Sequence, residues 1–416
     1  MNKERTSWYI YDFAKTAFNT TIISVFIGPY FNRIVNLAAD INGNLVLFNT
    51  LTIPAGSFYP YIVAISLMLQ VIILPISAYI SDNTNYGKKM LFIATYCGSI
   101  ATMCLFFVNE NNYNFGAILF IIANICFGLA TSIYNAYFKQ ISAKQNATQV
   151  SSIGWAAGFL GGGILLFLNL LLYNYAETLS IDKDLAVRIN LLSAGLWWAI
   201  FSIFPLKYFR KLTNKNNIKL KENYVNIIKN TENKNAILIF LTSYILYSSG
   251  IQAVMTLSAL FVNAELNITI DIIIIGILIL QFVAILGAFL FNLIAKYSSN
   301  LVSLKINLLV WILAIIFAYL LLQTVFDFIV LCVIIGIVIG GTQAISRPIF
   351  AQLIPKSKDA QFFCIYELSG KVLSWLGVLF FGLAYQITLS YRLSILSIIL
   401  FFALGLVLLC VKVKRK

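Results

Sequence analysis

Two acid–base pairs lie inside strongly apolar stretches of this 416-residue chain. Asp12 and Lys15 are three residues apart near the start, and Glu367 and Lys371 are four apart near the end. Residues at these spacings share one face of a helix, so each carboxylate can meet its ammonium group. A charged side chain at membrane depth costs roughly 3 kcal/mol and usually faces a bundle interior or a water-filled cavity. Either each pair is a mutually neutralising ion pair, or Asp12 or Glu367 takes up and releases a proton.

Four amide side chains fall near the middle of apolar stretches, and they are Asn19, Asn124, Gln252 and Gln281. An amide both donates and accepts hydrogen bonds, so it suits a zwitterionic or polar solute. Structural hydrogen bonds between membrane helices, worth roughly 0.6 kcal/mol each, explain such residues equally well. The four amides are therefore candidate substrate contacts, with a structural role as the alternative.

The composition indicates an integral membrane protein. The chain is 60% hydrophobic and 11% charged, whereas soluble globular proteins carry about 25% charged residues. The apolar stretch from Trp8 to Phe31 is long enough to span a bilayer, so we expect a retained first helix rather than a signal peptide. Six cysteines without CxxC spacing and the absence of histidine predict neither a metal site nor a cofactor.

Apolar runs of about 20 residues, the length that crosses a bilayer, recur along the chain. Six of them occupy 7–31, 58–80, 90–108, 116–137, 152–172 and 190–208, and six more occupy 236–262, 272–295, 302–322, 328–347, 362–386 and 393–411. We predict an all-α membrane protein of twelve transmembrane helices in two pseudo-symmetric six-helix bundles. The bundles are residues 1–208 and 236–416, joined by a basic cytoplasmic linker at 209–235.

Loop charges predict the orientation of the spans. Lysine and arginine gather in the linker, at both termini and in alternate loops, so the positive-inside rule places both termini in the cytoplasm. The net charge of +14 sits in short loops beside apolar spans, where contact with anionic lipid headgroups is expected. We expect no nucleic-acid partner, because a basic stripe on a recognised nucleic-acid-binding fold is missing.

A weak internal repeat supports the two halves: residues 138–158 can be laid over 350–370 without a gap. Duplicated six-helix halves are common in secondary transporters. Small residues four apart let membrane helices approach closely. We therefore assign Gly154, Gly158, Gly162 and Gly370 to helix packing rather than to substrate contact.

The loop from Ser77 to Lys89 joins an acid, a turn and two cations, and it resembles the signature loop of the major facilitator superfamily. The resemblance implies that Asp82 closes the cytoplasmic side, beside a helix start whose dipole favours a carboxylate. Lys88, Lys89 and Arg347 are assigned to the same gate. The loop departs from the family pattern at Asn85, where a glycine is expected, and an ordinary positive-inside loop is the alternative.

Several segments together resemble the vacuole-effluxer branch of that superfamily, from Ser7 to about Arg392. They are 8–31, 134–138, 150–163, 281–284 and 340–371. Yeast vacuolar amino-acid effluxers belong to this branch, as do bacterial homologues of unknown substrate. The resemblance implies a twelve-helix fold and solute transport.

The chain departs from this branch at three places that bear on substrate or coupling. Lys15 stands where the branch usually has asparagine, Ser248-Ser249 replaces an Asn-Asp pair, and Lys296 replaces an acid.

We expect a monomeric secondary transporter in a bacterial inner membrane, whose halves rock about a midplane cavity. Its partners are the lipid bilayer and a small polar solute, with amino acids favoured, and export is one of the directions left open. Alternatives are a transporter of nucleotides, sugars or peptides, and a transport-inactive membrane sensor. A membrane-embedded transferase would need nucleophiles, paired carboxylates or metal ligands gathered at one interface, and the sequence gathers none, so we expect no enzyme.

Overall fold

The computed structural model describes residues 3–47, 50–83, 86–141, 147–209, 234–353, 365–366 and 369–410. Within these ranges, side chains are described for all residues except 47, 74–83, 136, 138–140, 147–152, 155–156 and 351. The chain divides into two compact units, Met1–Ile218 and Lys219–Lys416, which we call the N-terminal and C-terminal units. Most of the predicted linker lies outside the described residues.

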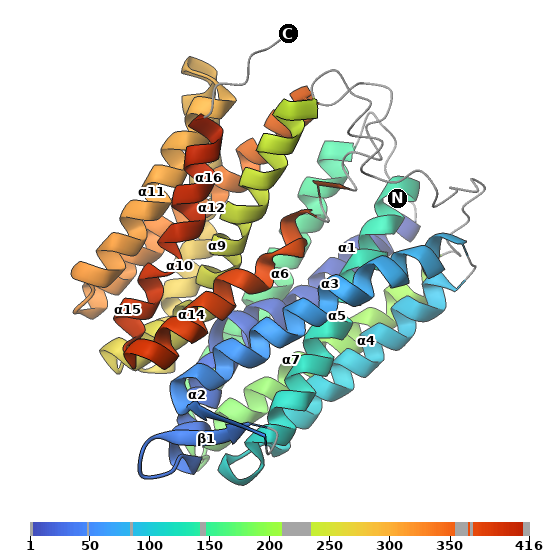
Figure 1. The fold of residues 1–416 in the computed structure, drawn as a ribbon. Coiled ribbons are helices and arrows are strands. Elements are labelled where there is room, and N and C mark those ends of the chain that lie inside the picture. Colours follow the sequence, from blue (N-terminus) through green and yellow to red (C-terminus); the bar gives the residue numbers. More distant parts are fainter. Residues whose placement is uncertain are drawn as a thin grey trace. The chain divides into compact units, whose positions relative to one another are not determined.

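The N-terminal unit is built from long helices and one hairpin (Figure 1). Its elements are α1 (Lys3–Ala17), the π-helix η1 (Phe18–Phe26), α2 (Ile27–Ala38), β1 (Asn44–Leu47), β2 (Leu51–Pro54), η2 (Ala55–Ser57), α3 (Phe58–Asn83), α4 (Gly87–Cys104), η3 (Leu105–Phe107), η4 (Glu110–Asn112), α5 (Tyr113–Ile141), α6 (Ala147–Asn174) and α7 (Lys183–Tyr208). The first helical path therefore continues without a break from Lys3 to Ala38.

The C-terminal unit repeats this plan with helices alone within its described residues (Figure 1). Its helices are α9 (Lys234–Leu266), α10 (Ile270–Tyr297), α11 (Asn300–Leu320), α12 (Val325–Leu353), α14 (Ser374–Thr388), α15 (Tyr391–Leu396) and α16 (Ile399–Cys410). Helical backbone precedes α14, at residues 365–366 and from Ser369 onward. The predicted start of this span at Phe362 lies outside the described residues.

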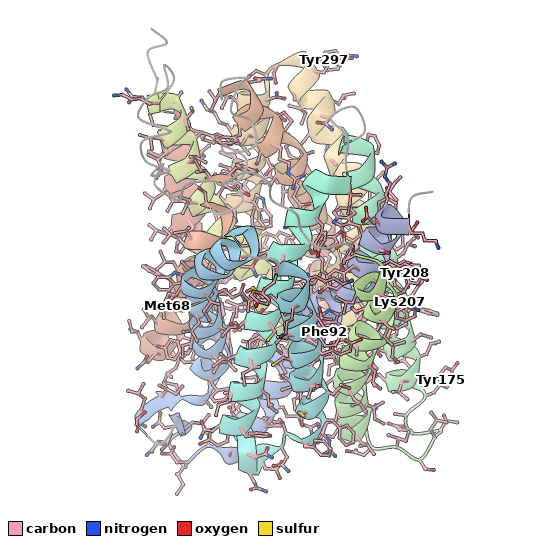
Figure 2. All side chains as sticks on the ribbon, turned by 90° about the vertical axis from the view of Figure 1, so that its right-hand side faces the viewer. Met68, Phe92, Tyr175, Lys207, Tyr208 and Tyr297 are labelled. Carbon is pink, nitrogen blue, oxygen red and sulfur yellow. The ribbon has the colours of Figure 1, made fainter. Side chains whose placement is uncertain are left out.

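Within the described residues, eleven helical segments are long and apolar enough to cross a membrane, five in the first unit and six in the second. The path from Lys3 to Ala38 adds the remaining span. Large apolar side chains cover the outer faces of these helices; Met68 on α3 and Phe92 on α4 are each about half exposed and point outward (Figure 2). Such apolar surfaces suit contact with lipid. The helices also satisfy their backbone hydrogen bonds internally, as the bilayer core requires. The prediction of an all-helical membrane protein is confirmed.

Two local features were not predicted. A short antiparallel hairpin follows the first span, with Leu45 opposite Ile53 and Val46 opposite Thr52. The side chains of Tyr113 and Asn114 on α5 donate hydrogen bonds to the Val46 carbonyl, at 3.1 and 3.3 Å, and so fix the hairpin to the bundle. The second feature is the π-helix η1, which interrupts the first span in its middle. Single π-turns within α-helices are rare and often mark functional sites.

A three-way contact of Arg392 closes one end of the C-terminal unit. Its guanidinium pairs with Glu265 on α9 at 2.7 Å, and it donates hydrogen bonds to the carbonyls of Tyr319 and Leu322 at the end of α11. The three segments α9, α11 and α15 therefore meet on one side chain.

Replacing Arg392 by Gln is expected to destabilise the C-terminal unit by about 2 kcal/mol, because hydrogen bonds to a charged group are worth about 1.5–3 kcal/mol. Thermal unfolding in detergent measures the change. Lys183→Gln is the matched control, since the Lys183–Glu177 pair is half or more exposed at both side chains and such pairs contribute little. Equal stability of the two variants would contradict the assignment.

Candidate functional site

The site is centred on an ion pair inside α1. The Lys15 ammonium lies 2.7 Å from the Asp12 carboxylate, and each side chain is only 11% exposed. The two residues are three apart on one helix, so the α-helical rise and turn alone bring their side chains to the same face. The N-terminal unit therefore holds one buried negative charge and one buried positive charge, and the two cancel.

Aromatic rings of α5 surround the lysine. The ammonium of Lys15 lies 4.8 Å from the ring centroid of Tyr134 and 6.0 Å from that of Phe127, which is cation–π distance. Trp8, one turn before Asp12, stacks on Tyr134 with centroids 4.6 Å apart and donates its indole N–H to the Tyr134 carbonyl at 3.3 Å. These contacts join α1 to α5 around the charged pair.

Two buried hydroxyl groups lie on the same face of α5. The Tyr134 hydroxyl interacts with the Asp12 carboxylate, whereas the Thr131 hydroxyl makes no hydrogen bond to the described residues. Phe127, Thr131 and Tyr134 follow each other at intervals of four and three, so they form one stripe of α5. The stripe that holds Lys15 therefore also carries one polar group, the Thr131 hydroxyl, without a partner among the described residues.

Glycines of α6 pack against α1, and a Cβ on Gly158 would lie 3.5 Å from a carboxylate oxygen of Asp12. A Cβ atom on Gly158 would lie 2.8 Å from the Thr16 hydroxyl, and one on Gly162 would lie 2.6 Å from the Thr20 hydroxyl. A Cβ on Gly154 would overlap the Trp8 ring, and one on Gly161 would overlap the Phe13 carbonyl oxygen. The small residues of α6 thus admit the backbone of α1 at close range, which is the packing mode of small-residue stripes in membranes.

A third contact fixes α1 to α4. The hydroxyl groups of Tyr11 and Thr95 lie 2.6 Å apart, and both side chains are fully buried. Tyr11 also lies beside Tyr134, with ring centroids 5.4 Å apart. The helix turn from Trp8 to Lys15 is therefore held by α4, α5 and α6 at once.

The four predicted amides separate into two kinds. Asn124 is 3% exposed, donates to the Ser66 hydroxyl at 2.7 Å, and accepts at its backbone carbonyl from Gln70 at 2.8 Å, so it joins α5 to α3. Gln252 donates to Thr256 on its own helix at 3.0 Å. Asn19 and Gln281 are half-buried, and their amides make no hydrogen bond within the described part of the chain. Asn19 lies in the π-helix, directly after the Asp12–Lys15 turn.

We expect Asn19→Ala and Asn124→Ala to act differently. Loss of the Asn124 bond between two helices is expected to lower stability by about 0.6–1.7 kcal/mol and to leave solute exchange per folded molecule intact. Asn19→Ala removes an amide that has no structural bond among the described residues, so stability is expected to hold while exchange falls. Thermal unfolding and exchange assays on both variants separate the roles, and the reverse pattern would show that Asn124 is the substrate contact.

The remaining predicted residues are placed as follows. Glu367 lies outside the described residues. Lys371 is half-buried and has further interactions, and Gly370 faces Tyr244 of α9, whose hydroxyl would lie 2.8 Å from a Cβ there.

The residues predicted to form the cytoplasmic gate are only partly described. The side chain of Asp82 is not among the described side chains. Lys88 donates to the Lys207 carbonyl at 3.3 Å, while Lys89 and Arg347 are exposed. Lys207 lies beside Tyr208 at the end of α7 (Figure 2), over which the Lys3 ammonium also sits, at 5.5 Å.

Sequence reasoning missed Phe127, Thr131 and the role of Tyr134. The only signal for them is their helical spacing on α5, which many buried stripes share. In the described part of the chain, no three histidine, cysteine or acidic side chains gather as a metal site would require.

Comparison with known proteins supplies the relatives of this chain. The family model described as vacuole effluxer Atg22 like matches residues 1–416. An uncharacterized MFS-type transporter, YxiO of Bacillus subtilis, is 24% identical over 98% of this chain and 94% of that protein. Autophagy-related protein 22 of Saccharomyces cerevisiae is 24% identical over 98% of this chain and 91% of that protein.

Solved structures agree on the fold. A point mutant of the nucleoside transporter NupG superposes with a TM-score of 0.72 at 14% identity, covering 98% of both chains. A D-xylose-proton symporter gives a TM-score of 0.72 at 13% identity, covering 97% of this chain and 95% of the symporter. The predicted major facilitator fold is therefore confirmed, while likeness at this identity says nothing about the solute.

Proposed function

Since the chain belongs to the Atg22-like vacuole effluxer family of the major facilitator superfamily, we propose that this secondary transporter moves small zwitterionic solutes, amino acids first among them. The protein is an integral membrane transporter of a small molecule and not an enzyme. The solute class and the direction of movement are the proposal.

The observation that carries this proposal is the buried Asp12–Lys15 pair. A zwitterion presents one ammonium and one carboxylate, which match one buried carboxylate and one buried ammonium. Sugars and nucleosides carry no such pair of charges. The resemblance to the vacuole-effluxer branch, which includes yeast vacuolar amino-acid effluxers, supports the same solute class.

We further propose export from a bacterial cytoplasm by a monomer in the plasma membrane, coupled to protons through Asp12 and Glu367. The strength of the similarity to a Bacillus protein supports this location. The sequence offers no histidine as an alternative relay.

Reconstitution into proteoliposomes tests the solute class. Vesicles preloaded with unlabelled amino acids are expected to accumulate labelled amino acids by counterflow. Vesicles preloaded with unlabelled nucleosides or pentoses are expected not to accumulate the corresponding labelled nucleoside or pentose. Accumulation of a nucleoside or sugar alone would overturn the proposal.

An imposed pH gradient tests proton coupling. Amino-acid flux is expected to respond to the gradient, and an unchanged response after neutralising both Asp12 and Glu367 would contradict the proton mechanism.

A further inference from the structure

Lys15 occupies a place that fits any primary ammonium group. Its ammonium touches the Asp12 carboxylate at 2.7 Å and lies over the rings of Tyr134 and Phe127. A carboxylate with aromatic faces is the combination that recognises ammonium ligands.

The place also has more polar capacity than Lys15 uses. An ammonium group has three N–H donors, and in the described residues one is directed to Asp12. The Tyr134 hydroxyl interacts with the Asp12 carboxylate, and the buried Thr131 hydroxyl, on the same stripe of α5, has no hydrogen-bond partner among the described residues. Buried hydroxyls are normally satisfied, so Thr131 indicates a ligand that the lysine replaces only in part.

The lysine can leave. Its charge is at the end of a flexible four-carbon stem, whereas the Asp12 carboxylate is a single carbon away from the helix backbone. Asp12, by contrast, is held on an α1 turn that α4, α5 and α6 fix through Tyr11, Trp8 and the glycine contacts. The carboxylate side of the pair is therefore fixed and the ammonium side is movable.

We propose that Asp12, Phe127, Thr131 and Tyr134 form a binding site for the amino group of the transported solute, and that Lys15 is its tethered occupant, displaced when solute binds. This inference rests on the proposed function and specifies its recognition step. The incoming ammonium pairs with Asp12, and the released Lys15 ammonium pairs with the carboxylate of the same solute. Every charge then keeps a partner, as membrane depth requires.

This exchange predicts a specific selectivity. A zwitterion satisfies both Asp12 and Lys15, whereas a plain amine displaces Lys15 and leaves it unpaired. The wild-type protein therefore binds norvaline and not butylamine, which is norvaline without its carboxylate. After Lys15→Ala the site is vacant, and butylammonium alone fills it.

The experiment measures the melting temperature of purified protein with butylammonium chloride, norvaline or sodium chloride at matched ionic strength. For Lys15→Ala, butylammonium is expected to raise the melting temperature saturably by about 3–6 °C when it is well above its dissociation constant. The wild type and the double variant Asp12→Asn, Lys15→Ala are expected not to respond to butylammonium. No response of folded Lys15→Ala, or an equal response of the double variant, overturns the site.

If Lys15→Ala does not survive purification in sodium buffer, purification in butylammonium buffer becomes the test. Recovery of folded protein in the amine alone supports the site, and failure in both buffers overturns it. The readout is stability and not flux, so it is separate from the proposed function. If butylammonium rescues Lys15→Ala but the protein does not transport amino acids, the ammonium site stands and the proposed solute class is wrong. If the protein transports amino acids but butylammonium gives no rescue, the ammonium site is wrong.

Discussion

Replacing Asp12 by Asn is expected to abolish solute exchange and to destabilise the protein by about 3–5 kcal/mol, the usual effect of removing one partner of a buried ion pair. The reason is that the Lys15 ammonium, 11% exposed, is left without its carboxylate. Thermal unfolding and counterflow in proteoliposomes measure the two effects.

A double variant separates stability from function. Adding Lys15→Met to Asp12→Asn removes the uncompensated charge, so most of the stability is expected to return while exchange stays absent. Glu177→Gln is the control for neutralising an acid, because its partner Lys183 is half exposed and such pairs are worth little. Wild-type exchange by Asp12→Asn would show that the pair has no part in transport.

Replacing Gly161 by Ala is expected to destabilise the N-terminal unit by about 3 kcal/mol, at the upper end of the usual cost of overpacking. The new Cβ would overlap the carbonyl oxygen of Phe13. Backbone cannot rotate away as a side chain can, so α1 and α6 must separate. Because the same α1 turn carries the ion pair, exchange is expected to fall with stability. Thermal unfolding of the purified variant measures the loss.

Gly163 provides the matched control two residues along the same helix. A Cβ on Gly163 would meet no atom within 4 Å. Alanine there is expected to be neutral or to stabilise the helix by about 0.5–1 kcal/mol, since glycine is the poorer helix former. An equal loss of stability in Gly161→Ala and Gly163→Ala would mean that the close contact between Gly161 of α6 and Phe13 of α1 is not the cause of the destabilisation.

Much of the architecture could be predicted from the sequence, because a bilayer demands long apolar helices and few other patterns satisfy it. The span of α7 starts earlier than its apolar run, at Lys183, since Asp182 caps the helix by accepting from the Asp184 N–H at 3.2 Å. The spacing of Asp12 and Lys15 likewise places them on one face. These features depend on local sequence alone.

The rest of the site depends on which helices meet. The rings of Phe127 and Tyr134 reach Lys15 only because α5 lies against α1. The Asn124 amide belongs to a structural bond because Ser66 of α3 happens to face it. No residue type distinguishes these partners in advance, and the π-helix at Phe18–Phe26 has no composition that sets it apart from its α-helical neighbours.

That π-helix also sets the direction in which the ion pair faces. Its hydrogen bonds reach one residue further along the chain than those of an α-helix, and one residue corresponds to about 100° around a helix axis. Asp12 and Lys15 lie before η1 and α2 lies after it. The face of α1 that carries the pair is therefore offset, relative to α2, from the face that an uninterrupted α-helix would present.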